Sequence, residues 1–269
     1  MSADHPAIAV DAVDSHIAKW LAVEPEMEVA LAFAGAGKRR AMLWGALLNE
    51  WLDATFGLSD AGVARVKLAW WGNALQTASI ESPHPLVRAL VEAWDDRVAV
   101  APWVALTEAT VELLEIDDSP RDVDALIATR RSMAQALGEV ERVLWPNSGA
   151  PDTMGVIRSL LLRQWRGHIP GRLPQPGWLP LQLLARHDLR MQAAYDGLGT
   201  DACRALLSDL ATELLACPAG LTGSRIRRIR TQFDALALSR LQSARAQPFR
   251  IGGFRSVWGS WRAARGAPE

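Results

Sequence analysis

Apolar side chains recur at helical spacing along this chain, and that pattern most constrains its fold. Met154, Ile157 and Leu161, for example, are three and four positions apart and therefore share one face of a helix. No segment shows the alternation of apolar and polar residues between turn residues that indicates a β-strand. We therefore predict an all-α protein.

Turn residues and prolines divide this pattern into separate helices. A helical segment over 11–35 is interrupted at Glu24-Pro25-Glu26, and Ser59 is a predicted cap for the helix that follows Gly57. Further helices are predicted at 38–56, 61–78, 86–98, 101–115, 121–144, 153–168, 179–196, 200–216 and 224–246, with a last amphipathic segment at 254–265. No linker separates two cores, so we expect a single domain over 1–269, with 1–15 loosely ordered.

Composition and charge exclude several classes of protein. Of the 269 residues, 49% are hydrophobic, which is enough for a sizeable core, and the net charge of -1 argues against a general nucleic-acid binder. The first residues lack the basic start and apolar run of a signal peptide, and no stretch approaches the roughly 20 apolar residues of a membrane span. These features favour a soluble, cytoplasmic protein.

Charge is distributed unevenly along the chain. Six acids and one lysine precede residue 29, whereas ten arginines and one acid, Asp234, lie between 225 and 265. A basic run of this kind indicates either a surface for an anionic lipid, phosphate or acidic partner, or a solvated helix face. The basic amphipathic C-terminal segment, 248–269, fits an interfacial membrane anchor or a helix packed on the domain.

The stretch 152–189 carries the most informative polar residues. Asp152 or Thr153 caps its first helix, whose apolar face also holds Gln164 and His168, one turn apart. Polar groups on a buried face cost free energy unless they are hydrogen-bonded. We therefore expect a cavity or a polar network inside the protein at this helix.

Several motifs, in order, resemble the squalene/phytoene synthase family. LLLRQWRGH and the following GRLPQPGWLPLQLLARHDL resemble its second aspartate-rich helix and the loop and helix after it. VKLAWWGNAL, SPHPLVRAL and the helix around Gly138 resemble three further segments, so that the resemblance runs from about Val29 to Arg262. It implies an isoprenoid-synthase-type helical bundle around a central cavity.

The metal-binding positions of that family are where this chain departs from it. Active members ionise a prenyl diphosphate with Mg²⁺ ions held by aspartates on facing helices. The second pair of aspartates falls on Gln164 and His168, and only Glu50 and Asp53 remain where the first cluster would lie. Glu50 is either a surviving metal-facing acid or a helix glutamate paired with an arginine at the edge of the core.

Other candidate groups flank these positions. Arg172, on the loop after the second helix, is a candidate phosphate ligand, whereas Arg163 and Arg166 are predicted to point away from the inner face. Glu50, Gln164 and His168 together also form a conceivable transition-metal site, but hydrogen-bonded core residues are the preferred interpretation and no metal is expected.

Three functional hypotheses follow from the resemblance and its departures. The preferred one is a non-catalytic protein with an apolar, isoprenoid-type cavity, no cofactor, and a binding or assembly role; family branches with eroded aspartates look like respiratory-complex assembly factors. The first alternative is an active, Mg-dependent, head-to-head prenyl diphosphate transferase. The second is a peripheral membrane protein that uses its basic C-terminal segment. A protein partner is compatible with the first hypothesis, and no nucleic acid is expected.

Overall fold

The computed structural model describes residues 6–116, 118–166, 178–196, 200–243 and 254–265. All regular structure in these residues is helical, which confirms the all-α prediction. The helices are α1 (Pro6–Val23), α2 (Glu26–Ala32), α3 (Lys38–Phe56), α4 (Ala61–Gln76), α5 (Pro85–Trp94), α6 (Arg97–Val100), α7 (Trp103–Leu114), α8 (Val123–Leu144), α9 (Thr153–Arg166), α10 (Leu181–Arg186), α11 (Met191–Asp196), α12 (Asp201–Ala216), α13 (Arg225–Gln242) and α14 (Phe254–Ala264). Two 3₁₀ turns, η1 (Gly35–Gly37) and η2 (Pro146–Ser148), precede α3 and follow α8.

Short polar side chains cap several of these helices, and one of two predicted caps is confirmed. Asp152 caps α9 by accepting a 2.9 Å hydrogen bond from the backbone N–H of Gly155. The cap of α4 is Asp60, which accepts from Val63 at 3.0 Å, and not the predicted Ser59. Each cap satisfies an amide that the first helical turn leaves without an intrahelical partner.

Two predicted helices are interrupted near an aspartate. The helix predicted at 179–196 is divided into α10 and α11, and the one predicted at 86–98 ends at Trp94. Asp188 and Asp95 adopt positive φ angles of 51° and 53°, which interrupt a right-handed helix. Aspartate is among the few residues other than glycine that enter this region readily. At the N-terminus, α1 begins at Pro6, inside the segment expected to be loosely ordered.

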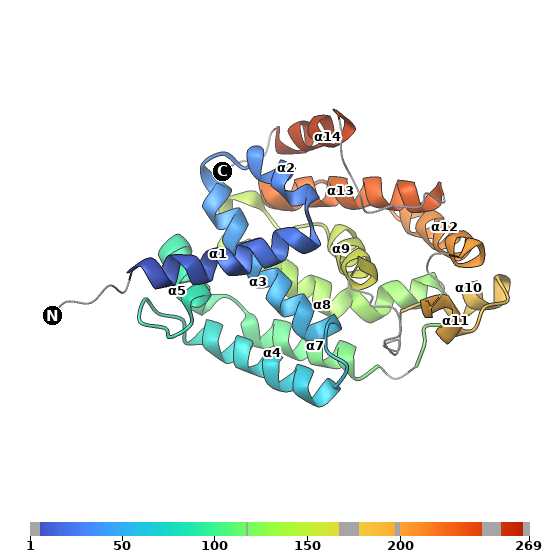
Figure 1. The fold of residues 1–269 in the computed structure, drawn as a ribbon, viewed down its shortest axis with the longest axis horizontal. Coiled ribbons are helices and arrows are strands. Elements are labelled where there is room, and N and C mark those ends of the chain that lie inside the picture. Colours follow the sequence, from blue (N-terminus) through green and yellow to red (C-terminus); the bar gives the residue numbers. More distant parts are fainter. Residues whose placement is uncertain (1–5, 117, 167–177, 197–199, 244–253, 266–269) are drawn as a thin grey trace.

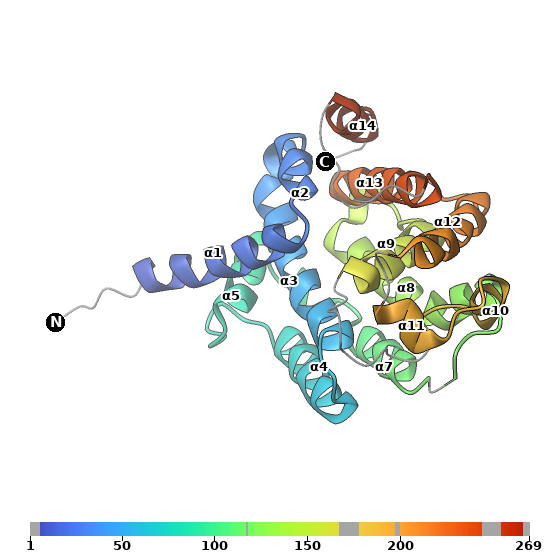
Figure 2. The same cartoon turned by 45° about the vertical axis from the view of Figure 1, so that its right-hand side comes forward.

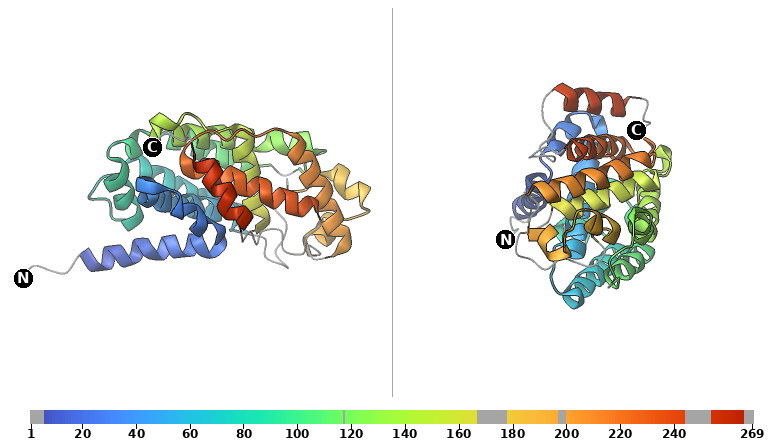
Figure 3. Two further views of the ribbon diagram at one scale, coloured as in Figure 1. Left: turned by 90° about the horizontal axis from the view of Figure 1, so that it is seen from above. Right: turned by 90° about the vertical axis from the view of Figure 1, so that its right-hand side faces the viewer.

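The helices pack around α3, α8 and α9 (Figure 1). Helix α3 contacts α1, α2, α4, α5 and α9, while α8 packs between α7 and α9. Helix α13 lies over α9 and α12, and α14 is the outermost helix on α13 (Figures 1 and 2). The first turns of α1 project from the body in the left panel of Figure 3. One connected hydrophobic core extends from Val13 of α1 to Ala263 of α14.

A glycine allows α1 to approach α3 closely. A Cβ atom on Gly45 would lie within 2.4 Å of the Trp20 ring, which no real contact permits. Trp20 is buried, and its indole N–H donates a 2.6 Å hydrogen bond to Glu24 Oε2. This contact fixes the turn between α1 and α2 and places the Glu24 carboxylate inside the protein.

Candidate functional site

Glu50 and Asp53 of α3 are held by cations from α1 and α4. Glu50 Oε1 accepts a 3.0 Å hydrogen bond from Lys19 Nζ and lies 3.2 Å from His16 Nδ1. Asp53 Oδ2 lies 3.3 Å from Lys67 Nζ and 3.5 Å from Lys19 Nζ. Glu50 is therefore a paired helix glutamate, but its partners are histidine and lysine and not the arginine predicted. We call these five residues the α3 surface cluster.

Hydrogen bonding sets the charge of the α3 surface cluster. The hydrogen bond with His16 lowers the pKa of Glu50 to about 2; burial opposes this effect and Lys19 adds to it. Burial alone would lower the pKa of Lys19, but the hydrogen bond and charge of Glu50 raise it. Glu50 is thus ionised and already neutralised by its neighbours. A cation that used Glu50 as a ligand would first have to displace them.

Gln164 of α9 is part of a polar network, as the sequence predicted. It is buried, and its Oε1 accepts a 2.8 Å hydrogen bond from Arg130 Nη2 of α8. One residue earlier, Arg163 Nη2 donates a 2.7 Å hydrogen bond to Asn49 Oδ1. Asn49 of α3 therefore contacts α9, while Glu50 contacts α1 and α4. Glu50 and Gln164 do not share one site.

The prediction that Arg163 and Arg166 point away from the inner face is wrong. Both side chains are almost fully buried, and Arg166 forms an ion pair with Glu26 of α2. A helical projection assumes that one face of the helix meets water. In α9 every residue from Gly155 to Trp165 is buried, because α3, α8 and α13 surround it.

Two arginines of the basic run are also inside the protein. Arg230 of α13 binds Glu24 with two hydrogen bonds, 2.8 Å from Nη1 to Oε1 and 2.6 Å from Nη2 to Oε2. Arg227 donates from Nε to both oxygens of Glu141, at 3.1 and 3.0 Å. The run therefore forms neither a continuous anionic-ligand surface nor a continuous solvated face.

These buried groups form several hydrogen-bonded sets between α2, α3, α8, α9 and α13, which are together called the buried polar network. Burial alone would raise the pKa of Glu24, but the charge and hydrogen bonds of Arg230 lower it to about 2. Burial lowers the pKa of Arg163, whose described hydrogen-bond partner, Asn49, is neutral. The members are Glu24, Glu26, Asn49, Arg130, Glu141, Ser159, Arg163, Gln164, Arg166, Arg227, Arg230 and Asp234.

Most members of this network were not predicted from the sequence. Glu24 and Arg230 are 206 positions apart, and neither belongs to a motif. Arg130 and Asn49 also carried no signal beyond their position in predicted helices. His168 and Arg172 lie outside the described residues. In the part of the chain that the structure describes, no three His, Cys, Asp or Glu side chains are grouped to hold a metal ion.

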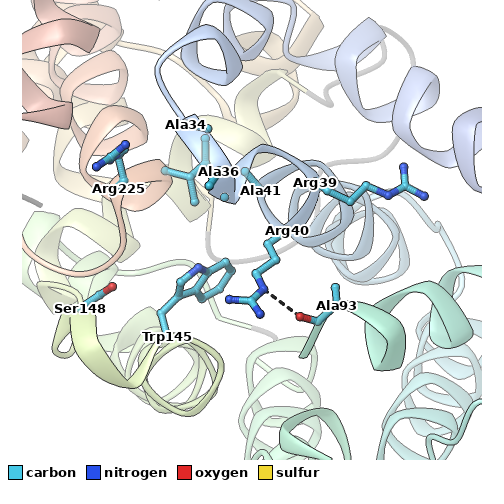
Figure 4. A pocket seen from close by; sticks show the side chains of 11 residues that line it. Ala34, Ala36, Arg39, Arg40, Ala41, Ala93, Trp145, Ser148 and Arg225 are labelled. Carbon is cyan, nitrogen blue, oxygen red and sulfur yellow. Dashed lines mark hydrogen bonds between the residues drawn. The ribbon is translucent and has the colours of Figure 1, made fainter. Parts of the chain in front are cut away.

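A pocket of about 450 Å³ lies near the start of α3 (Figure 4), and one of its lining residues, Ile226, directly precedes Arg227 of the buried polar network. It is bounded by the η1 turn and α3, the end of α5, the residues after α8, and the start of α13. Its lining residues are Ala34, Ala36, Gly37, Arg39, Arg40, Ala41, Ala93, Trp145, Ser148, Arg225 and Ile226. Arginines and apolar side chains therefore share one concave surface.

Comparisons with known proteins assign this chain to no family. No family model, curated protein or solved structure matches the chain. None of the described helices combines the length and apolar character needed to cross a bilayer.

Proposed function

We propose that this protein is a non-catalytic relative of the squalene/phytoene synthases with a binding or assembly role. The observation that carries the proposal is the pairing of polar groups at the two positions that resemble the aspartate-rich motifs. Glu50 is engaged by His16 and Lys19, and Gln164 is engaged by Arg130. Each group has a partner within the protein.

Ionisation of a prenyl diphosphate places strong demands on such positions. The leaving group is a polyanion, and Mg²⁺ ions held by several carboxylate oxygens neutralise its developing charge. On α9 the side chains at and beside Gln164 are cationic or neutral, Arg130 and Arg163, and the acids that reach α9, Glu26 and Asp234, are held by Arg166 and Ser159. The arginines repel a divalent cation and Gln164 binds it weakly, so Mg²⁺-dependent chemistry is disfavoured.

The isoprenoid-synthase fold and an apolar central cavity remain part of the proposal. They are supported by the all-α architecture and by the order of the motifs along the chain. In this interpretation the bundle keeps a shape suited to an isoprenoid or other apolar ligand, or to a protein partner, after the metal ligands are lost.

A direct assay separates this proposal from an active transferase. Purified protein is incubated with farnesyl or geranylgeranyl diphosphate and Mg²⁺, and diphosphate release is measured beside an active squalene synthase. We expect no release above the rate without protein. Release at an enzyme-like rate would show that the head-to-head prenyl diphosphate transferase is the correct alternative.

A second candidate function, peripheral membrane binding, is favoured by the outer face of α14. Val257 and Trp258 are 45% and 49% exposed, and Arg262 and Arg265 are exposed beside them. Apolar and basic side chains on one helix suit an anionic bilayer surface. Co-sedimentation with phosphatidylglycerol vesicles tests this function. Binding by the wild type should weaken in Trp258→Ser, and equal binding by both would remove this candidate.

A further inference from the structure

The pocket beside α3 has the composition of an anion site. Among its described lining residues are three arginines and no acid. Arg39 extends away from Trp145 in Figure 4, and its Nη1 lies 3.7 Å from Asp14 Oδ1. Arg40 instead points across the pocket and donates from Nε to the carbonyl oxygen of Ala93 at 2.8 Å. In the described structure its two terminal nitrogens make no hydrogen bond.

The backbone at this pocket also favours negative charge. Helix α3 is 19 residues long, and its N-cap, Gly37, provides no side-chain cap, although the backbone N–H of Lys38 donates to the carbonyl oxygen of Gly35 in the preceding turn. The dipole of a helix of this length makes its N-terminal end favourable for an anion. No atom lies within 4 Å of the position that a Cβ on Gly37 would occupy, so a ligand can approach this turn. The start of α13, with Arg225, lies at the same pocket.

An apolar wall completes the pocket. Trp145 is half-buried, and its ring is held edge-on against Trp44 and Trp94, with centroid separations of 5.7 and 5.1 Å. Ala34, Ala36 and Ala41 leave space beside this ring. The volume of about 450 Å³ lies within the usual range for small-molecule sites, roughly 300–1,000 Å³.

We propose that this pocket binds a soluble phosphate-bearing ligand that also has a flat apolar part. Arg40 and Arg225 contact the phosphate groups near the N-terminal end of α3, and Trp145 contacts the flat part. Arg40 and Glu50 are ten residues apart on α3, about 15 Å along the helix, so this is a different place from the positions that resemble the aspartate-rich motifs. The inference does not depend on the proposed function.

Calorimetric titration with ADP, inorganic pyrophosphate and adenosine tests the proposal. ADP should bind the wild type more tightly than pyrophosphate, and adenosine should bind weakest, because each contains only part of the recognised chemistry. Ser148→Asp places a carboxylate in the pocket from a partly exposed turn, and Arg40→Gln removes one cation. Each substitution should weaken ADP binding about tenfold or more. Circular dichroism of each variant establishes that it is folded.

The matched control is Arg121→Gln, which makes the same substitution at a side chain that is 89% exposed and belongs to neither the pocket nor the two clusters. It should bind ADP like the wild type. Absence of ADP binding, or equal binding by the wild type and Ser148→Asp, overturns the proposal. Phosphatidate vesicles form a further arm: vesicle binding that Ser148→Asp abolishes, without ADP binding, would replace the soluble ligand by a lipid headgroup.

Discussion

The α3 surface cluster and the buried polar network neutralise carboxylates in different surroundings. In the network, Glu24 and Arg230 are both buried and meet through two parallel hydrogen bonds. In the cluster, Glu50 is buried but its partner Lys19 is 49% exposed. Arginine presents a planar fork that matches a carboxylate, whereas lysine is a flexible point charge. The Glu24–Arg230 pair should therefore contribute much more to the free energy of unfolding than the Glu50–Lys19 pair.

The largest effect is expected from breaking the Glu24–Arg230 pair. Arg230→Met leaves Glu24 buried with its main cation removed, so the free energy of unfolding should fall by about 3–5 kcal/mol. Urea unfolding followed by circular dichroism measures this loss. Adding Glu24→Gln to the same chain should recover part of it, because the unpaired charge is then absent. A loss below about 1 kcal/mol would show that water or another cation reaches Glu24.

The difference in the free energy of unfolding between the wild type and Glu24→Gln should depend on pH, because it comes from the same ion pair. The pKa of Glu24 is about 2 in the folded protein and about 4.5 in the reference state. The ionised form therefore stabilises the fold above pH 4.5, and this contribution disappears as pH falls towards 2. At neutral pH the wild type should exceed the variant by on the order of 3 kcal/mol. Urea unfolding at pH 7, 4.5 and 3 should show this difference shrinking. A constant difference contradicts the assignment.

A smaller effect is expected from Glu50→Gln in the α3 surface cluster. The pKa of Glu50 is also about 2, but Lys19 is half-exposed and solvent screens its charge. The free energy of unfolding should fall by about 1 kcal/mol, and the loss should shrink further in 0.5 M salt at about a 4 Å screening length. The loss for Arg230→Met should change little with salt. Equal salt sensitivity in both variants would remove the distinction between the two regions.

The sequence predicted the parts of this molecule that depend on local residues. Helix α3 has the predicted bounds, 38–56, because Gly37 and Gly57 flank a continuous helical pattern. Asp152 caps α9 by a contact only three residues away. The helix breaks near Asp95 and Asp188 were not predicted from the sequence, since aspartate adopts positive φ only where the tertiary packing requires it.

Of the candidate site, the sequence indicated the burial of Gln164 but not its partner. Arg130 lies 34 positions earlier on another helix, and one sequence contains no record of that contact. Arg163 was predicted to point outward because its helix was treated as amphipathic, whereas α9 is buried on all sides. Arginine is seldom buried without partners, so only the packed structure reveals this arrangement.

The smallest effect is expected from Lys67, the second lysine of the α3 surface cluster. Lys67 is 32% exposed, and its Nζ lies 3.3 Å from Asp53 and 3.9 Å from Glu50. Lys67→Met keeps the aliphatic stem and removes the charge, so the free energy of unfolding should fall by only about 0.5 kcal/mol. Lys19 still contacts both carboxylates, and millimolar Mg²⁺ should therefore leave the melting temperature of this variant unchanged. A Mg²⁺-dependent rise would mean that Glu50 and Asp53 bind the metal once one lysine is gone, which would revive the enzymatic alternative.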